Sequence, residues 1–121
     1  MIIGQHLVLD LFNVKEKSLN KLNKNNYDKL IKPKLLEILN LNNLELVSEN
    51  VHFSESNLSV SASYILTDAF IHLNVWPTRA FIGIDIFTSG KDQDTKKICH
   101  EIKELFDYEK EKIMYLKRGI R

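Results

Sequence analysis

The sequence is poor in residues that form covalent or metal cross-links. Its 121 residues include one cysteine, Cys99, so an internal disulfide is excluded. The four histidines and Cys99 are not spaced like the paired ligands of a zinc site. We therefore expect no metal, and a single unpaired cysteine is typical of a protein in the reducing cytoplasm.

Long hydrophobic runs and an excess of one charge are also missing. No stretch approaches the roughly 18 consecutive apolar residues that a membrane span needs, and residues 1–4 lead into a strand pattern without the features of a signal peptide. The chain has 17 Lys and Arg and 16 Asp and Glu, for a net charge of +1, whereas a protein that neutralises many phosphates carries a basic excess. We expect a cytoplasmic protein that binds neither a membrane nor nucleic acid.

The residues that are present suit one folded domain. Hydrophobic residues make up 44% and charged residues 27% of the chain, which is too apolar for a disordered segment. A length of 121 residues matches one domain with one core, so we assign residues 1–121 to a single domain. Residues 13–43 are rich in asparagine and lysine, which we interpret as a solvated surface and not as a binding tract.

Hydrophobic periodicity divides the chain into strands and helices. Strands, recognised by alternation and by β-branched and aromatic residues, are predicted at 3–12, 44–53, 58–66, 70–76, 79–87 and 112–116. The second and third strands form a hairpin with a turn at 54–57. Apolar residues at helical spacing predict helices within 27–41 and over 94–108.

Each predicted helix has a distinctive start. Pro33 lacks an amide donor, so the first helix begins at Lys32 or bends there. Asp94 or Thr95 can cap the second helix by accepting hydrogen bonds from its first free amides. The buried stripe of this second helix is predicted to consist of Ile98, Ile102, Leu105 and Phe106.

The strands at 70–76 and 79–87 separate two kinds of side chain, because successive residues of a strand point to opposite faces. One face is aliphatic and comprises Ile71, Leu73, Val75, Ala80, Ile82, Ile84 and Ile86. The other face mixes aromatic and polar groups, namely Phe70, His72, Asn74, Trp76, Phe81, Asp85 and Phe87. Such a mixture is unusual on a merely solvated surface, so we expect this face to bind a ligand or a partner.

The predicted order of elements is strand, helix, four strands, helix and strand. We therefore assign the chain to the α+β class, as a two-layer α/β sandwich with a mainly antiparallel sheet and helices on one face. The helices are expected to cover the aliphatic face. The open face is then the expected surface for a ligand and for a second chain.

Four short motifs, in order and at matching spacing, resemble those of the small prokaryotic S-adenosylmethionine decarboxylases. They are GQHLV at 4–8, VWP at 75–77, IDIFTSG at 84–90 and LKRG at 116–119. Each motif is short, but together they span almost the whole chain. The resemblance implies the fold of that family, a context of polyamine biosynthesis and a homodimer.

The family makes its own cofactor, and the resemblance implies what that chemistry needs. The proenzyme cuts itself between a Glu and a Ser, and the Ser becomes an N-terminal pyruvoyl group that forms a Schiff base with the substrate amine. The family segment reads ESHLTIHTWPE. Aligned on Trp76 and Pro77, its Glu and Ser fall on Asp68 and Ala69. Ala69 has no hydroxyl, so we expect no self-cleavage and no pyruvoyl cofactor.

The same alignment finds further changes at positions that are functional in the family. The processing His falls on Asn74, the proton-donating Cys on Ser89, and the Glu that holds the substrate ribose on Thr78. Ser61 keeps a side chain that has a processing role in the family. The changes together indicate divergence and not a single blocking substitution.

A shifted alignment would let another residue take the place of the missing serine. The candidates are Ser63, Thr67 and His72. Using Ser63 needs a six-residue insertion inside a strand, and a shift by an odd number of residues exchanges the two faces of the sheet. We therefore keep the alignment on Trp76 and Pro77.

Several residues on or beside the open face have two roles open to them. His72 is a structural histidine or a general base, and Asp85 is a hydrogen-bonded structural carboxylate or a catalytic acid. Asn74 serves binding or packing. Trp76 and Phe53 either stack on an adenine ring or are simply buried.

Two functions from different classes follow. In the first, the chain is a non-decarboxylating relative that binds S-adenosylmethionine or a related nucleoside, or that pairs with an active paralogue and regulates it. In the second, it is a lyase or hydrolase that cleaves S-adenosylmethionine without a pyruvoyl group, by orientation and electrostatics. His72, Asp85 and Ser89 are the candidate residues for that second function.

Overall fold

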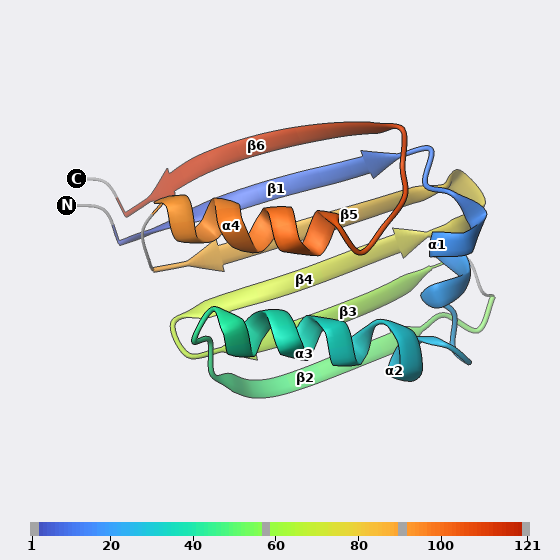
Figure 1. The fold of residues 1–121 in the computed structure, drawn as a ribbon, viewed down its shortest axis with the longest axis horizontal. Coiled ribbons are helices and arrows are strands. Elements are labelled where there is room, and N and C mark those ends of the chain that lie inside the picture. Colours follow the sequence, from blue (N-terminus) through green and yellow to red (C-terminus); the bar gives the residue numbers. More distant parts are fainter. Residues whose placement is uncertain (1–2, 57–58, 90–91, 120–121) are drawn as a thin grey trace.

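The computed structural model describes residues 3–56, 59–89 and 92–119 and consists of one sheet with helices on one side (Figure 1). In chain order the elements are β1 (Gly4–Phe12), α1 (Glu16–Lys21), α2 (Tyr27–Leu30), α3 (Lys32–Leu41), β2 (Leu46–Phe53), β3 (Val60–Leu66), β4 (Ala69–Trp76), the 3-10 helix η1 (Pro77–Arg79), β5 (Phe81–Thr88), α4 (Asp92–Lys103) and β6 (Lys110–Arg118). The predicted order of strands and main helices is confirmed.

The sheet is antiparallel throughout, with the strand order β2-β3-β4-β5-β1-β6. In Figure 1, α3 lies over the half of the sheet that contains β2 and β3, and α4 lies over β5 and β1 on the same face. The prediction of an α+β two-layer sandwich is therefore confirmed. The strands at the two edges are β2 and β6.

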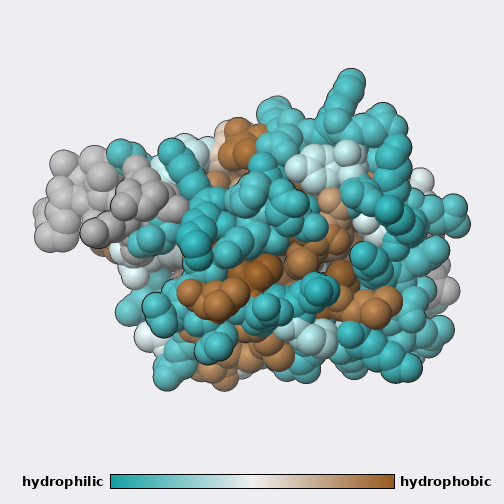
Figure 2. Space-filling view, viewed as in Figure 1, coloured by the Kyte–Doolittle hydropathy of each residue, from teal (hydrophilic) through white to brown (hydrophobic). Residues whose placement is uncertain are grey.

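The aliphatic face of the sheet forms the core beneath the helices. The pairs Ile71 with Ile86, Leu73 with Ile84 and Val75 with Ile82 lie opposite each other, and all six side chains are buried. The side that carries the helices is mostly hydrophilic at its surface, with a hydrophobic strip between α3 and α4 (Figure 2). Across the three described ranges, no helix is long and apolar enough to span a membrane.

Ala80 does not belong to the aliphatic face, contrary to the prediction. It has a φ of 50° and ends η1, where its amide donates to the carbonyl of Pro77. Its own carbonyl accepts a hydrogen bond from the amide of Val14. The tight turn after Trp76 therefore takes Ala80 out of the strand, and β5 begins at Phe81.

The predicted cap of the last helix is also wrong. α4 begins at Asp92, so Asp94 and Thr95 lie in its first turn and not at its N-cap. Thr95 is buried, with its Oγ1 2.6 Å from Thr88 Oγ1 on β5, so its hydroxyl ties the helix to the sheet. α4 ends at Lys103, but Phe106 still packs into the core beyond it.

The helical run within 27–41 is interrupted at Ile31, between α2 and α3, and Pro33 lies in the first turn of α3, as the missing amide donor of proline requires. The segment from 13 to 43 is more ordered than a solvated surface. It contains α1, where buried Ser18 accepts a hydrogen bond from the Asp107 amide at 2.8 Å. This segment therefore supplies part of the helical layer.

Candidate functional site

Ala69 is the first residue of β4 and follows a tight turn. Thr67 and Asp68 connect β3 to β4, and Asp68 has a φ of 57°, in the left-handed region. Ala69 pairs with Leu66 on β3 and with Thr88 on β5. Strands on both sides therefore fix the position of Ala69, whose side chain is a methyl group without a hydroxyl.

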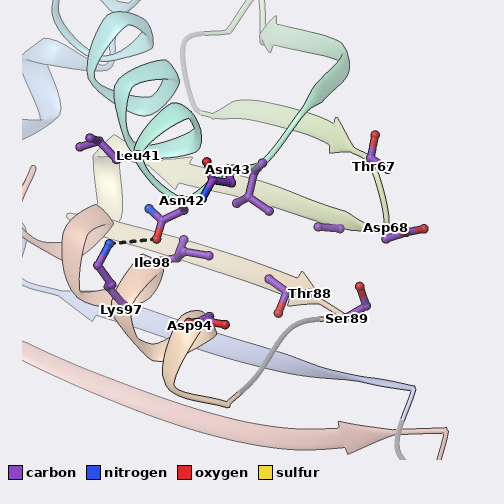
Figure 3. Close-up of a pocket in the computed structure, with 12 residues that line it drawn as sticks. Leu41, Asn42, Asn43, Thr67, Asp68, Thr88, Ser89, Asp94, Lys97 and Ile98 are labelled. Carbon is purple, nitrogen blue, oxygen red and sulfur yellow. Dashed lines mark hydrogen bonds between the residues drawn. The ribbon is translucent and has the colours of Figure 1, made fainter.

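A cavity of about 470 Å³ opens beside Ala69, between the end of α3, the start of α4 and the end of the sheet (Figure 3). Asp68 and Ala69 line it from the β3–β4 turn, Ser89 lines it from the end of β5, and Asp94 and Lys97 line it from α4. The structure thus brings together three positions that the sequence analysis selected, namely Asp68, Ala69 and Ser89.

A network of polar side chains holds one wall of this cavity. Lys97 Nζ donates to Asn42 Oδ1 at 3.1 Å (Figure 3) and lies 3.4 Å from Glu101 Oε2. Asn42 Nδ2 in turn donates to Glu101 Oε1 at 2.7 Å. The charge of Lys97 is thus balanced by Glu101, while Asp68 and Asp94 add two carboxylates to the lining. The cavity is electrostatically suited to a group that carries positive charge.

A second, mostly apolar cavity of about 560 Å³ lies on the other side of Ala69 and includes Ile3, Phe70, Phe87 and Arg118. The rings of Phe70 and Phe87 are stacked, with centroids 5.8 Å apart and planes at 17°. Parallel aromatic rings beside an open cavity can receive another flat ring. The sequence analysis placed both Phe70 and Phe87 on the open face but did not select them as ligand-binding residues.

Asn74 and Ser61 lie far from this end of the sheet. Ser61 Oγ donates to Asn74 Oδ1 at 3.2 Å across β3 and β4, which are paired directly at these residues. Asn74 follows Ala69 by five residues, and a strand rises about 3.4 Å per residue, so the two are roughly 17 Å apart. One chain therefore does not bring Asn74 to Ala69.

Phe53 and Trp76 do not form the predicted sandwich around an adenine ring within one chain. Phe53 pairs with Val60, whose side chain is buried under the helices, and its ring lies 6.0 Å from that of Tyr27 on α2. Trp76 projects from the open face, where it lines a cavity of about 390 Å³ with Arg79 and Phe81. The two rings are on opposite faces of the sheet, so of the two alternatives the stacking of both on one adenine ring is not met within one chain.

Thr78 lies in η1 next to Trp76 and is exposed. It therefore belongs to the same end of the sheet as Trp76 and Asn74, and it has no contact with the cavities beside Ala69. The predicted binding and processing residues thus divide into two groups. One group, with Asp68, Ala69 and Ser89, lies at the start of β4, and the other lies around its end.

His72 and Asp85 lie between these two groups, in the middle of the open face. They sit directly opposite each other on β4 and β5. Ser63 Oγ lies 2.6 Å from His72 Nδ1, and His6 Nε2 donates to Asp85 Oδ1 at 3.0 Å. The sequence analysis considered Ser63 only as a substitute for the missing serine and did not pair it with His72.

Ser89 does not join His72 and Asp85. It follows Asp85 by four residues along β5 and is therefore roughly 13 Å away from it at the usual strand rise. The set of His72, Asp85 and Ser89 that was proposed for pyruvoyl-independent cleavage is thus not assembled in one chain. Its first two members remain together, with Ser63 and His6 as their hydrogen-bond partners.

Cys99 lies apart from the two groups of residues described above. Cys99 is buried in α4, and its burial raises the pKa of the thiol to about 11. The thiol is therefore protonated near neutral pH and is a poor nucleophile. Within the described parts of the chain, His, Cys, Asp and Glu side chains form no group of three or more that could hold a metal ion.

The comparisons of this sequence with known proteins agree on one family. The family described as S-adenosylmethionine decarboxylase matches residues 5–119. The S-adenosylmethionine decarboxylase proenzyme of Clostridium botulinum (strain Loch Maree / Type A3) is 32% identical over 116 residues, which cover 96% of this chain and 94% of that protein. The proenzyme of the same name from Pyrococcus furiosus is 28% identical over 118 residues, covering 98% of this chain and 80% of that protein.

A solved structure supports the fold independently. The adenosylmethionine decarboxylase of Aquifex aeolicus VF5 superimposes with a TM-score of 0.79 at 16% sequence identity. The superposition covers 99% of this chain and 93% of the other. The two-layer architecture is therefore shared over the full length of the described chain.

Proposed function

The chain belongs to the S-adenosylmethionine decarboxylase family, and on that premise we propose that it is a member that does not convert itself into a pyruvoyl enzyme. The observation that carries the proposal is Ala69, at the position that the alignment on Trp76 and Pro77 gives to the pyruvoyl-forming serine. A methyl group can neither attack the preceding carbonyl nor become a ketone. The residues of this chain therefore do not fit the pyruvoyl group.

Neighbouring hydroxyls do not offer an obvious replacement. Thr67, in the same turn, donates its hydroxyl to Glu45 Oε1 at 2.7 Å. Ser63 lies inside β3, in a ladder with β4 that is continuous from Val60 to Leu66. A regular antiparallel ladder holds every residue on a fixed face. Both observations support the absence of self-cleavage.

We propose that the chain binds S-adenosylmethionine or a related nucleoside beside Ala69. The stacked rings of Phe70 and Phe87 suit a flat base, and the carboxylates of Asp68 and Asp94 suit a positively charged group on the other side of Ala69. The two cavities share Asp68 and Ala69 in their linings, so together they fit a ligand that joins a nucleobase to a cationic centre.

We further propose a homodimer in which two copies meet through their open faces. The large hydrophobic side chains of Trp76, Met114 and Leu116 are exposed there. The polar side chains of the same face are bonded to one another across the strands, so covering them leaves few groups without a partner. If the strands of one copy are antiparallel to those of the other, the Trp76 end of one sheet lies over the Ala69 end of the other sheet.

The biological setting that we propose is polyamine biosynthesis in the cytoplasm, where the chain binds its ligand or pairs with an active decarboxylase and regulates it. The names of the relatives support the family's chemistry. The pyruvoyl-independent lyase or hydrolase is not favoured, because Ser89 is separated from His72 and Asp85.

Mass spectrometry of the purified, intact protein tests the first part. One species at the full chain mass of 14.1 kDa is expected, whereas two fragments, the second with a pyruvoyl terminus, overturn the proposal. Titration calorimetry with S-adenosylmethionine, followed by chromatography of the products, tests the second part. Heat of binding without new products supports a binding protein, and release of methylthioadenosine supports the lyase instead. With no heat of binding, co-purification with an active decarboxylase tests the regulatory role.

A further inference from the structure

We propose that protonation of His72 separates the two copies of the homodimer, so that the open face is a pH-sensitive interface. The inference rests on the homodimer proposed above. The carrying observation is the hydrogen bonding in the middle of that face. His6 Nε2 donates to Asp85 Oδ1 at 3.0 Å, whereas His72 Nδ1 lies 2.6 Å from Ser63 Oγ. One of these two histidines thus has a carboxylate as its partner, and the other has a neutral hydroxyl.

The two histidines therefore respond differently to a falling pH. Histidine is the side chain whose charge ordinarily changes between pH 5 and 8. When His6 gains a proton, it forms an ion pair with Asp85, so its charge is balanced in a single copy and in the dimer alike. When His72 gains a proton, its hydrogen-bond partner Ser63 stays neutral. In a single copy water can solvate the new charge, because His72 is only half-buried there.

The surroundings of His72 on the open face are largely apolar. Phe70 precedes it by two residues on β4, and the Phe70 ring is stacked on that of Phe87 with centroids 5.8 Å apart. Val8 and Met114 lie in the same row across the strands as His72. A second copy that covers these apolar groups also removes His72 from water. A charge without a charged partner is costly to bury.

The other charged groups of the open face do not supply the missing anion. The titratable and charged side chains that the described strands place on this face are His6, His52, His72, Asp10, Asp85, Lys110, Lys112 and Arg118, with Arg79 at its Trp76 end. Asp85 lies directly opposite His72, but its carboxylate already accepts a hydrogen bond from His6. Asp10 lies directly opposite Lys112. Cations therefore outnumber carboxylates on this face before any histidine is protonated.

The symmetry of a homodimer adds to the cost of the charge on His72. A twofold axis presents the same patch on both copies. If the strands of the two copies are antiparallel, the middle of one open face lies over the middle of the other, so two positive charges approach each other without solvent. Two separate copies therefore bind more protons than the dimer does. By linkage, a falling pH shifts the equilibrium toward separate copies.

His100 provides a matched control within the same chain. It lies on α4, on the helix side, and 66% of its side chain is exposed. Its Nε2 lies 3.5 Å from Glu104 Oε1, one turn further along the chain. The proposed dimer leaves the helix side uncovered, so a proton on His100 should not affect the association of the two copies.

Sedimentation equilibrium at pH 7.5 and pH 5.5, at one ionic strength, tests the inference. The dissociation constant of the wild type should rise at least about tenfold at the lower pH, since one extra proton per separate copy changes it by up to about 100-fold per pH unit. His72→Gln stays neutral and keeps a hydrogen-bonding side chain, so it should lose most of the rise. His100→Gln should keep the rise. Asp85→Asn leaves His6 with a neutral partner as well, so its rise should be steeper.

The outcomes separate this inference from the homodimer on which it rests. A wild-type dissociation constant that is the same at both pH values overturns the inference and leaves the homodimer standing, whereas a monomer at pH 7.5 at every concentration overturns both. An equal rise in the wild type and in His72→Gln, a rise that is lost in His100→Gln, or a rise in Asp85→Asn no steeper than that of the wild type also overturns it. Circular dichroism at both pH values monitors folding, and wild-type dissociation that coincides with unfolding contradicts a switch at the interface.

Discussion

Ala69 and Asn74 lie on the same strand but on opposite faces of the sheet. Ala69 alternates with the buried residues Ile71 and Leu73, whereas Asn74 is bonded to Ser61 on the open face. A hydroxyl restored at Ala69 would therefore not meet position 74 of its own chain. Any chemistry that needs both positions requires a second copy.

This geometry makes Ala69→Ser an informative variant. We expect the variant to remain one intact chain, because Asn74 cannot serve as a base even when a second copy brings it close. Intact mass after prolonged incubation measures the outcome. Efficient cleavage of the single variant would mean that the hydroxyl was the one missing element and that the divergence we propose is far smaller.

The stacked phenylalanines give a second prediction. Phe87→Leu should weaken nucleoside binding by about 0.5–1.5 kcal/mol, the usual contribution of an aromatic pair beyond its buried area. Calorimetry with S-adenosylmethionine measures the change. Phe81→Leu removes a ring from the opposite end of the open face, where Phe81 contacts Phe12. A loss in Phe87→Leu alone indicates a site within one chain, and a loss in both indicates a site shared by two copies. No loss in either variant contradicts the stacking site.

Self-association through the open face gives a third prediction. Met114 on β6 is 50% exposed and lies on the open face, and Leu41 at the end of α3 is 60% exposed on the helix side. Met114→Glu should shift the mass in sedimentation equilibrium toward the monomer, because the interface would bury an unpaired charge. Leu41→Glu carries the same change of charge and should leave the mass unaltered. The reverse pattern would move the interface to the helix side.

The buried tyrosine pair gives a prediction for stability. The hydroxyls of Tyr27 and Tyr64 are hydrogen-bonded to each other beneath the helices. Tyr64→Phe leaves the Tyr27 hydroxyl buried without this partner, which should lower the free energy of unfolding by about 1–3 kcal/mol. Tyr27→Phe with Tyr64→Phe should recover part of the loss, because no polar group is then stranded. Urea unfolding at pH 7 measures both, and an equal loss in the two variants would contradict the explanation.

The same pair sets a pH dependence. Burial raises the pKa of Tyr64 to about 12, from a usual value of 10.0, and it also raises the pKa of Tyr27. The unfolded chain therefore releases these protons at lower pH than the folded chain does. The stabilising contribution is complete below pH 10 and is lost as the pH rises toward 12. The difference in unfolding free energy between the wild type and the double phenylalanine variant should shrink over that window.

The strands could be predicted from the sequence because their signal is local. Alternation of Ile71, Leu73 and Val75 fixes which side of β4 is buried, and the same holds for Ile82 and Ile84 on β5. The shared face depended on the register of that hairpin, and the structure pairs Val75 with Ile82 as this face requires. The cap of α4 failed because Thr95 bonds to Thr88, a contact between elements that local pattern does not reveal.

The site was harder to predict because it depends on pairing between strands. Stacking of Phe53 and Trp76 on one adenine ring was one of two alternatives, and the pairing of Phe53 with Val60 sets its ring on the other face of the sheet. The pair of Ser63 and His72 had a usable signal. A two-residue turn at Thr67 and Asp68 places Ser63 opposite His72. The predicted strands ended at 66 and began at 70, which left three residues between them and did not give this pairing.

The edge strand β6 has a consequence for the behaviour of concentrated protein. Its outer side lies at the border of the sheet, and its sequence includes Lys110, Lys112, Lys117 and Arg118 against the single acidic Glu111. Positive charges along an edge repel a second identical edge. Fibrillar growth by strand addition at this border is therefore opposed, even though Ile113 and Met114 would otherwise favour it.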